Sequence, residues 1–125
     1  MAAPADRKYA STHEWHKTEG DVVVIGITQH AVDELTDITF VELPAAGKKI
    51  SAGASFGEIE SVKATSELYS GIAGEIVASN AALKDDPSLV NQDPYGKGWL
   101  VKVKPANPAE LDALMSADQY NAKHG

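Results

Sequence analysis

Residues 54–69 read ASFGEIESVKATSELY and place Lys63 between two segments that have the pattern of β-strands. Before the lysine, apolar residues alternate with small or polar ones, as they do in a half-buried strand. After it, apolar residues recur among polar neighbours until the strand pattern resumes at residues 74–77. The pattern predicts that two strands meet near Lys63 and that the lysine lies at the tip of a hairpin.

A lysine at the tip of a hairpin can be the attachment point of a covalent group. Its flexible side chain ends in an amine, which is nucleophilic when deprotonated and forms an amide with a carboxylic acid. Most exposed lysines on turns, however, are simply solvated. The sequence around Lys63 therefore has to decide between these two interpretations.

Several separate blocks of sequence favour covalent attachment. They are residues 13–15 (HEW), 24–28 (VIGIT), 37–44 (DITFVELP), 57–64 (GEIESVKA) and 91–100 (NQDPYGKGWL). With these blocks in this order, the chain resembles the H protein of the glycine cleavage system, a lipoyl carrier, from Tyr9 to Tyr120. The block around the lysine is also similar to other lipoyl domains and to biotin carriers, whereas residues 93–100 are typical of H proteins.

The resemblance implies a mainly β fold, the lipoyl/biotinyl-type hybrid barrel-sandwich, in which two antiparallel sheets are accompanied by short helices and a C-terminal helix. The repeated Gly-Glu-Ile at residues 57–59 and 74–76 fits the pseudo-twofold symmetry of such a sandwich. A chain of 125 residues is expected to form a single lipoyl-carrier domain, residues 1–125. Within it, residues 1–7 are expected to be a loose tail and residues 107–122 a helix packed on the sandwich.

Local patterns predict further elements. Thr28 is expected to cap a helix over residues 29–35, in which apolar residues recur at helical spacing. Asn107, followed by Pro108, is expected to begin the C-terminal helix. Strands are expected at residues 9–10, 14–16, 22–25, 38–43 and 99–103, with a loop of short helical turns over residues 81–98.

The resemblance also implies how the protein works. Lys63 would carry lipoic acid as an amide, attached by a lipoate ligase or lipoyl transferase. The lipoyl group would accept the aminomethyl group that glycine decarboxylase, a pyridoxal-phosphate enzyme, generates. It would pass that group to the tetrahydrofolate-dependent aminomethyltransferase and then be reoxidised by dihydrolipoyl dehydrogenase. The protein itself would be a carrier and not an enzyme, since covalent attachment only keeps the intermediate close to successive active sites.

The aminomethyl group needs protection, because it is a cationic amine that loses its carbon as formaldehyde when exposed to water. A cleft with carboxylates would hold it. We expect Glu14 and Glu67 to supply these carboxylates and His30 to order the cleft wall. The alternative, that both glutamates are merely exposed strand residues, stays open, since solvated acids are common. The family often has an aspartate where Glu67 stands, so this carboxylate reaches one methylene further.

Other functions are compatible with a lysine in this position. A lipoyl domain of a 2-oxo acid dehydrogenase would be shorter and would lack the HEW block and the C-terminal helix. A biotin carrier would usually have methionines beside its lysine, where Val62 and Ala64 stand. A lipoyl relay that supplies lipoate to other enzymes, or an interaction module without lipoate, would use the same fold and the same lysine. The sequence does not distinguish a lipoyl relay or such an interaction module from a carrier of the glycine cleavage system.

The composition narrows the possible partners and chemistry. Lys and Arg number 11 against 18 Asp and Glu, so the net charge is −7 and no nucleic-acid partner is expected. The chain has no cysteine, which excludes a thiolate metal site and a cysteine nucleophile. His13 and His16 have an H-x-x-H spacing, but their segment is predicted to be a strand without a third ligand, so no metal is expected.

The sequence also bears on location and assembly. No apolar run approaches the roughly 18 residues that a membrane span needs, and residues 1–7 are too short and polar for a signal peptide. We therefore expect no membrane partner. The expected location is the cytoplasm if the source is bacterial, or the mitochondrial matrix if the chain is a mature eukaryotic form. A shuttle that visits several enzymes is most simply a monomer.

Overall fold

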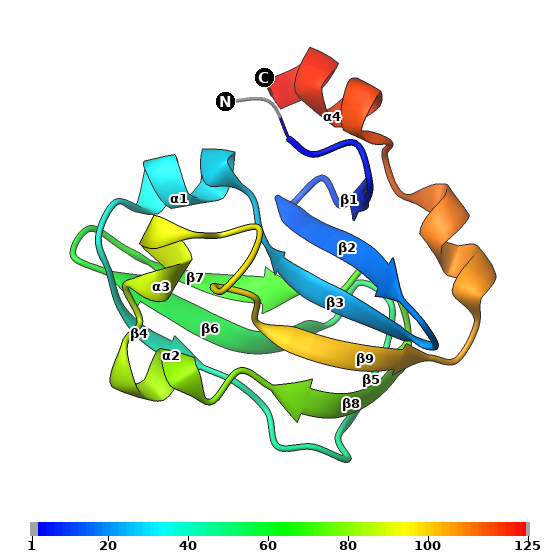
Figure 1. The fold of residues 1–125 in the computed structure, drawn as a ribbon, viewed down its shortest axis with the longest axis horizontal. Coiled ribbons are helices and arrows are strands. Elements are labelled where there is room, and N and C mark those ends of the chain that lie inside the picture. The colour runs from blue at the N-terminus through cyan, green and yellow to red at the C-terminus, as the bar shows by residue number, and fades with distance from the viewer. Residues whose placement is uncertain (1–2, 125) are drawn as a thin grey trace.

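The computed structural model describes residues 3–124, which form two antiparallel β-sheets with short helices at their edges (Figure 1). The larger sheet has the strand order β1-β2-β3-β9-β8-β5, and the smaller has the order β4-β6-β7. The strands are β1 (Lys8–Tyr9), β2 (Glu14–Glu19), β3 (Val22–Ile27), β4 (Ile38–Glu42), β5 (Lys49–Ile50), β6 (Ser55–Ser61), β7 (Thr65–Tyr69), β8 (Gly74–Ser79) and β9 (Val101–Pro105). The helices are α1 (Gln29–Leu35), α2 (Ala82–Asp85), α3 (Leu89–Gln92), the 3-10 helix η1 (Pro108–Ala113) and α4 (Ala117–His124). The predicted fold of two antiparallel sheets with short helices is confirmed.

The main core lies between the two sheets. Strand β3 contributes Val23 and Ile25 from the larger sheet, and β7 contributes Leu68 from the smaller. Successive side chains of a strand point to opposite faces, so Val24 lies on the other side of β3. A second apolar cluster covers that side and is formed by Ala3, Tyr9, Trp15, Val24, Ala117 and Tyr120. Strand β3 is therefore buried on both faces, which explains its almost continuous apolar sequence.

Helix α1 begins and ends where the sequence predicts. The hydroxyl of Thr28 accepts a hydrogen bond from the backbone N–H of Ala31 at 3.3 Å, as an N-cap residue does. At the other end, the N–H of Thr36 donates to the carbonyl of Val32 at 2.8 Å, and the chain turns away with a φ of 63° at Thr36. The helix buries Ala31 and Val32 against the main core, which leaves its outer side free for polar side chains.

The N-terminal segment differs from the prediction. In the described part of the expected tail, residues 3–7, Ala3 is buried and its N–H donates to Asn121 Oδ1 at 2.9 Å. The guanidinium of Arg7 lies over the ring of Trp15, 4.6 Å from its centroid. The prediction of a loose tail is wrong for these residues, because burial and a cation–π contact offset the cost of ordering them. The first two residues of the expected tail lie outside the described residues.

The predicted helix over residues 107–122 is two helices and not one. Asn107 caps η1 as predicted, accepting a hydrogen bond from the N–H two residues later at 3.2 Å. Leu114 is then extended, with a ψ of 160°, and Met115 exchanges backbone hydrogen bonds of 2.8 and 2.9 Å with Tyr9. This pairing with β1 takes backbone groups that a continuous helix would need for itself, so α4 begins anew after it (Figure 1).

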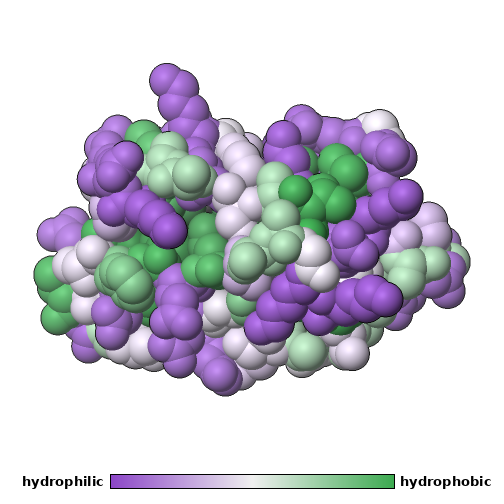
Figure 2. Space-filling view, turned by 90° about the horizontal axis from the view of Figure 1, so that it is seen from below, coloured by the Kyte–Doolittle hydropathy of each residue, from purple (hydrophilic) through white to green (hydrophobic). Residues whose placement is uncertain are grey.

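One face of the molecule is predominantly polar (Figure 2). The face shown in Figure 2 is mostly hydrophilic and carries separate apolar areas bordered by polar side chains. Among the described residues, no helix combines the length and the apolar character that crossing a bilayer requires. The large apolar side chains exposed in the described part of the chain include Val62, which is 69% exposed and is the neighbour of Lys63. The hairpin tip therefore exposes an apolar side chain, Val62, beside the charged side chain of Lys63.

Candidate functional site

Lys63 lies at the predicted place, in the turn between β6 and β7. The two strands pair as far as Glu60 and Thr65, and the N–H of Ser61 then donates to the carbonyl of Ala64 at 2.8 Å. The hydroxyl of Ser61 accepts from the backbone N–H groups of Lys63 at 3.2 Å and Ala64 at 3.0 Å. One side chain thus satisfies two amide groups, which orders the backbone of a turn whose side chains are exposed.

The amine of Lys63 is accessible. Its Nζ donates one long hydrogen bond of 3.4 Å to the backbone carbonyl of Glu34, near the end of α1. The N–H of Val62 donates to the carbonyl of Asp37 at 3.0 Å, which anchors the hairpin tip to the segment after α1. No ion pair holds the amine among the residues described. The turn is therefore fixed while the side chain remains free to react.

A tight turn places Glu14 at the start of β2. His13 adopts a φ of 77° and donates its N–H to the carbonyl of Ala10 at 3.0 Å, and the N–H of Ala10 donates to the carbonyl of Glu14 at 2.9 Å. A left-handed conformation is uncommon for a residue with a side chain, although histidine adopts it more readily than most. The turn brings Thr12 next to Glu14, and the Thr12 hydroxyl donates to Glu14 Oε1.

Glu14 is a buried carboxyl group. Only 1% of the residue is exposed, and its Oε2 accepts a hydrogen bond from the backbone N–H of Tyr69 at 3.0 Å. Burial raises the pKa of Glu14 from 4.5 to about 7, against the opposing effect of the hydrogen bonds from Thr12 and Tyr69. Near neutral pH the group can therefore exist with or without its proton, and a cation placed beside it would favour the carboxylate.

A cavity of about 520 Å³ lies beside this carboxyl group. Its lining includes both hydrogen-bond partners of Glu14, namely Thr12 and Tyr69, and also Leu114 and Lys123 from the C-terminal segments. The volume lies within the range of small-molecule sites in proteins. The two partners thus separate the Glu14 carboxyl from a space large enough for a small ligand.

Glu67 lies on the exposed side of β7. Its Oε2 accepts a hydrogen bond from the hydroxyl of Tyr69 at 2.8 Å. Tyr69 therefore contacts both predicted carboxylates, Glu67 through its hydroxyl and Glu14 through its backbone N–H. The structure connects these two glutamates through one residue. Among the described residues, no hydrogen bond or ion pair joins Lys63 to either of them.

His30 lies half-buried on α1, away from direct contact with the two glutamates. Its Nε2 is 2.8 Å from Glu34 Oε1, and its ring centroid is 4.5 Å from that of His13. The ring of His124, on α4, is 4.6 Å from that of His13. Burial, together with the positive charge that His30 and His124 can carry, lowers the pKa of His13. Three histidines thus gather at this place, whereas the sequence pointed to one.

Sequence reasoning did not identify Thr12, Tyr69 or His124. The sequence pattern could have indicated Tyr69, because it stands two residues after Glu67 in a predicted strand and so shares its face. No sequence pattern indicates Thr12 or His124, since their partners depend on the turn before β2 and on the docking of α4.

Comparison with known proteins gives a consistent result. The family model described as Glycine cleavage H-protein matches residues 7–124. The glycine cleavage system H protein of Bacteroides fragilis is 51% identical over 122 residues, which cover 98% of this chain and 97% of the relative. That of Magnetococcus marinus is 50% identical over 122 residues, covering 98% of this chain and 87% of the relative.

A crystal structure leads to the same family. The glycine cleavage system H protein from Mycobacterium marinum matches this fold with a TM-score of 0.89 and 42% identity, covering 97% of this chain and 98% of that one. The likeness extends over both sheets and the C-terminal helices and is not confined to the lysine hairpin. The chain therefore belongs to the glycine cleavage H-protein family, whose members are the lipoyl carriers of the glycine cleavage system and not enzymes.

Proposed function

We propose that Lys63 is the lipoyl attachment site through which this protein carries the aminomethyl group of the glycine cleavage system. The observation that supports the proposal is an exposed amine on a hairpin whose backbone is held by Ser61. When bound, the lipoyl group supplies a disulfide that accepts the aminomethyl group and is later regenerated from the dithiol. The chain presents one amine to the ligase or transferase that attaches lipoate.

The geometry of β7 indicates where the arm can lie. Thr65, Glu67 and Tyr69 alternate with buried Leu68 and therefore share the outer face of the strand. Glu67 is about 13 Å from Lys63 along the chain, at about 3.3 Å per residue. An extended lipoyl-lysine side chain measures about 14 Å from Cα to the ring, with bonds near 1.5 Å. An arm laid along this face would reach Glu67 and the cavity rim at Tyr69.

We propose that Glu67 holds the cationic amine that the arm carries and that Glu14, behind Thr12 and Tyr69, stabilises the same charge from beyond the cavity wall. Glu67 offers an exposed carboxylate on this face, and the hydroxyl of Tyr69 donates to it. Glu14 lies further inside the protein, behind Thr12 and Tyr69. It can gain or lose its proton near neutral pH, because burial raises its pKa to about 7. The cationic amine would favour the ionised form of Glu14, so the negative charge on Glu14 would form only when a positive charge is present to balance it. His30 remains a lesser candidate that orders the wall through its contact with Glu34.

The proposed partners are glycine decarboxylase, aminomethyltransferase, dihydrolipoyl dehydrogenase and a lipoate ligase or lipoyl transferase. A net charge of −7 favours encounters with enzymes that offer basic docking surfaces. A monomer in the bacterial cytoplasm fits such a shuttle, and the relatives described above are bacterial. The match over nearly the whole of each relative disfavours an isolated lipoyl domain of a 2-oxo acid dehydrogenase.

The attachment site is tested by incubating the protein with lipoate, ATP and a lipoate ligase and then measuring its intact mass and mapping its peptides. One lipoyl increment on the Lys63 peptide is expected. Lys63→Arg is the control and should gain no mass while folding like the parent, since the side chain is exposed. A lipoyl group on another lysine, or none on the parent, would overturn the assignment.

The roles of the glutamates are tested by formaldehyde release from the loaded protein. Glu14→Gln and Glu67→Gln should each release it about tenfold faster or more, since a hydrogen bond to a charged group is worth about 1.5–3 kcal/mol. Glu75→Gln is a matched control, because Glu75 is an exposed strand residue on the other sheet. Decay of both test variants at the parental rate would show that neither glutamate holds the loaded amine.

A further inference from the structure

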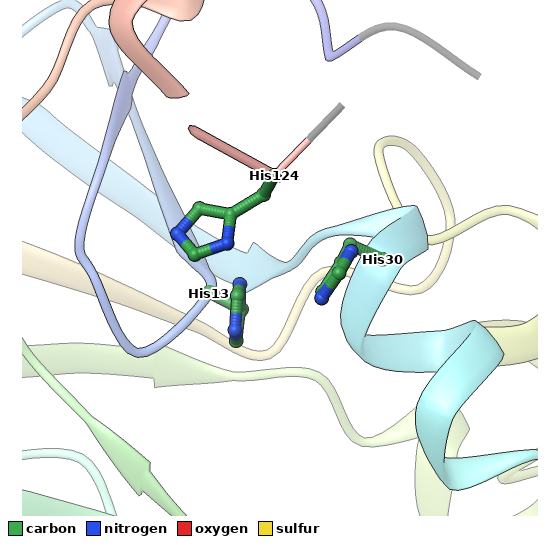
Figure 3. Close-up of side chains that lie close together, drawn as sticks. All are labelled: His13, His30 and His124. Atoms are coloured by element: carbon green, nitrogen blue, oxygen red, sulfur yellow. The ribbon is translucent and has the colours of Figure 1, made fainter. Parts of the chain in front are cut away.

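Three histidines from distant parts of the chain meet on one side of the molecule. His13 precedes β2, His30 lies in α1 and His124 lies at the end of α4 (Figure 3). One ring nitrogen from each can be chosen so that all three lie within 4.8 Å of one another. The ring centroids of His30 and His124 are 5.4 Å apart. The role proposed above for His30 rests on its contact with Glu34 and does not explain why His13 and His124 join it.

The remaining ring nitrogens are positioned by hydrogen bonds. His13 Nδ1 is 2.8 Å from the hydroxyl of Tyr120, which is itself 2.7 Å from the hydroxyl of Thr28. His30 Nε2 is 2.8 Å from the carboxylate of Glu34. Metal-binding histidines usually have their second nitrogen held by such a carboxylate or polar oxygen, which fixes the tautomer and the ring orientation. Nε2 of His13 and Nδ1 of His30 are then the nitrogens left for a ligand.

His124 adds an independent observation. Its Nε2 is buried and has no hydrogen-bond partner among the described residues. A buried nitrogen without a partner costs free energy unless a ligand or water satisfies it. Within residues 3–124, His13 and His30 each have one ring nitrogen held by a polar partner, whereas Nε2 of His124 has none.

We propose that His13, His30 and His124 bind one divalent transition-metal ion of the zinc class. Imidazole nitrogens suit zinc, copper and nickel, whereas calcium and magnesium prefer oxygen ligands. Three histidines leave a fourth tetrahedral position for water. Zinc–nitrogen bonds of about 2.0–2.1 Å place ligand nitrogens roughly 3.4 Å apart, so nitrogens that lie up to 4.8 Å apart here have to come closer when an ion binds. Side-chain rotations of half-buried rings can provide this movement.

The site would act as a clamp on the C-terminal helix. Helix α4 is otherwise held by buried Ala117, by Tyr120, whose ring stacks on Tyr9 with centroids 4.8 Å apart, and by the hydrogen bond between Asn121 and Ala3. A metal held by His124 together with His13 and His30 would tie this helix to α1 and to the turn before β2. This inference does not depend on lipoylation of Lys63, so either proposal can fail without the other.

The test uses the tag-free chain, stripped of metal by a chelator and titrated with zinc in a calorimeter. We expect one saturable site and a rise in Tm when zinc is present. His30→Gln and His124→Gln should each weaken zinc binding at least about tenfold, whereas Lys123→Gln, an exposed neighbour on α4, should leave it unchanged. Circular dichroism of the metal-free variants should match that of the metal-free parent, which checks that they are folded.

Two further measurements discriminate between a built site and adventitious binding. Cobalt in place of zinc should give the visible absorption of a tetrahedral ion in the parent and lose it in His124→Gln, while calcium and magnesium should produce no heat of binding. The proposal is overturned if zinc does not saturate a single site, or if the His124→Gln protein binds it as tightly as the parent. In either case the three rings are only packed together.

Discussion

Replacing Glu14 by glutamine should make the protein more stable than the parent at pH 8 and leave it about equally stable at pH 4.5. Burial raises the pKa of this carboxyl from 4.5 to about 7. The folded protein therefore holds the proton more tightly than the unfolded chain does. The resulting stability is fully present below pH 4.5 and is lost as the pH rises through about 7. The loss is roughly 3 kcal/mol, since one pKa unit corresponds to about 1.4 kcal/mol.

Glutamine is a suitable probe because it has nearly the same shape and is neutral at every pH. Its carbonyl can accept from the N–H of Tyr69, and its amide can donate to the hydroxyl of Thr12, which takes either role. Urea unfolding of parent and variant, followed by tryptophan fluorescence at several pH values between 4.5 and 8, gives the two free energies of unfolding.

The difference between parent and variant must be used, because another buried group titrates in the opposite direction. Burial lowers the pKa of His16 from 6.5 to about 4, so its contribution to stability is present above pH 6.5 and lost as the pH falls through about 4. Both proteins contain His16, and subtraction removes its effect. The free-energy difference should change by about 3 kcal/mol across the series.

A free-energy difference that stays constant with pH would refute the argument that Glu14 is a buried, poised carboxyl. Glu75→Gln provides the matched control, because the Glu75 side chain is exposed and meets solvent in both the folded and unfolded states. Its free-energy difference from the parent should stay level over the same range. If the control and Glu14→Gln behaved alike, the pH dependence would have to come from elsewhere in the chain.

Three further substitutions test other parts of the structure. Ser61→Ala should slow enzymatic lipoylation of Lys63 several-fold, as measured by mass spectrometry. It should lower the free energy of unfolding by less than about 1 kcal/mol, because the two amide groups that lose their acceptor can turn to water. Gly26→Ala should cost about 1–3 kcal/mol in urea unfolding, because a Cβ there would lie 2.5 Å from ring carbons of Trp15; unchanged stability would contradict this contact. Tyr120→Phe should cost about 1–3 kcal/mol in thermal unfolding, because its hydroxyl contacts both a histidine ring and the cap of α1; an unchanged Tm would show these bonds to be dispensable.

Features that depend on near neighbours could be predicted from the sequence. The cap of α1 by Thr28 and that of η1 by Asn107 follow from side chains that bind amide groups two or three residues away. The hairpin at Lys63 follows from strand patterns on both sides of a short turn. These features were confirmed because no distant contact opposes the local preference.

Features that depend on distant partners were missed or wrong. The extended break at Met115 is made by hydrogen bonds to Tyr9, far away in sequence, and the local helix pattern contained no sign of it. Ala3 is ordered by Asn121, which is 118 positions away. In both cases the competing contact exists only once the two ends of the chain lie together, as α4 and β1 do in Figure 1.

The sequence by itself determined the class of fold, the family and the lysine that we assign to lipoate, because alternation, turn residues and motif blocks are all local properties of a chain. Only the tertiary structure decided the chemical state of the groups around it. Whether Glu14 is solvated or buried, and so whether its pKa is ordinary or raised, depends on Tyr69 and the strands packed around it. Whether His13, His30 and His124 are three separate side chains or one cluster depends on where α4 docks, since ionisation and metal binding respond to surroundings in space.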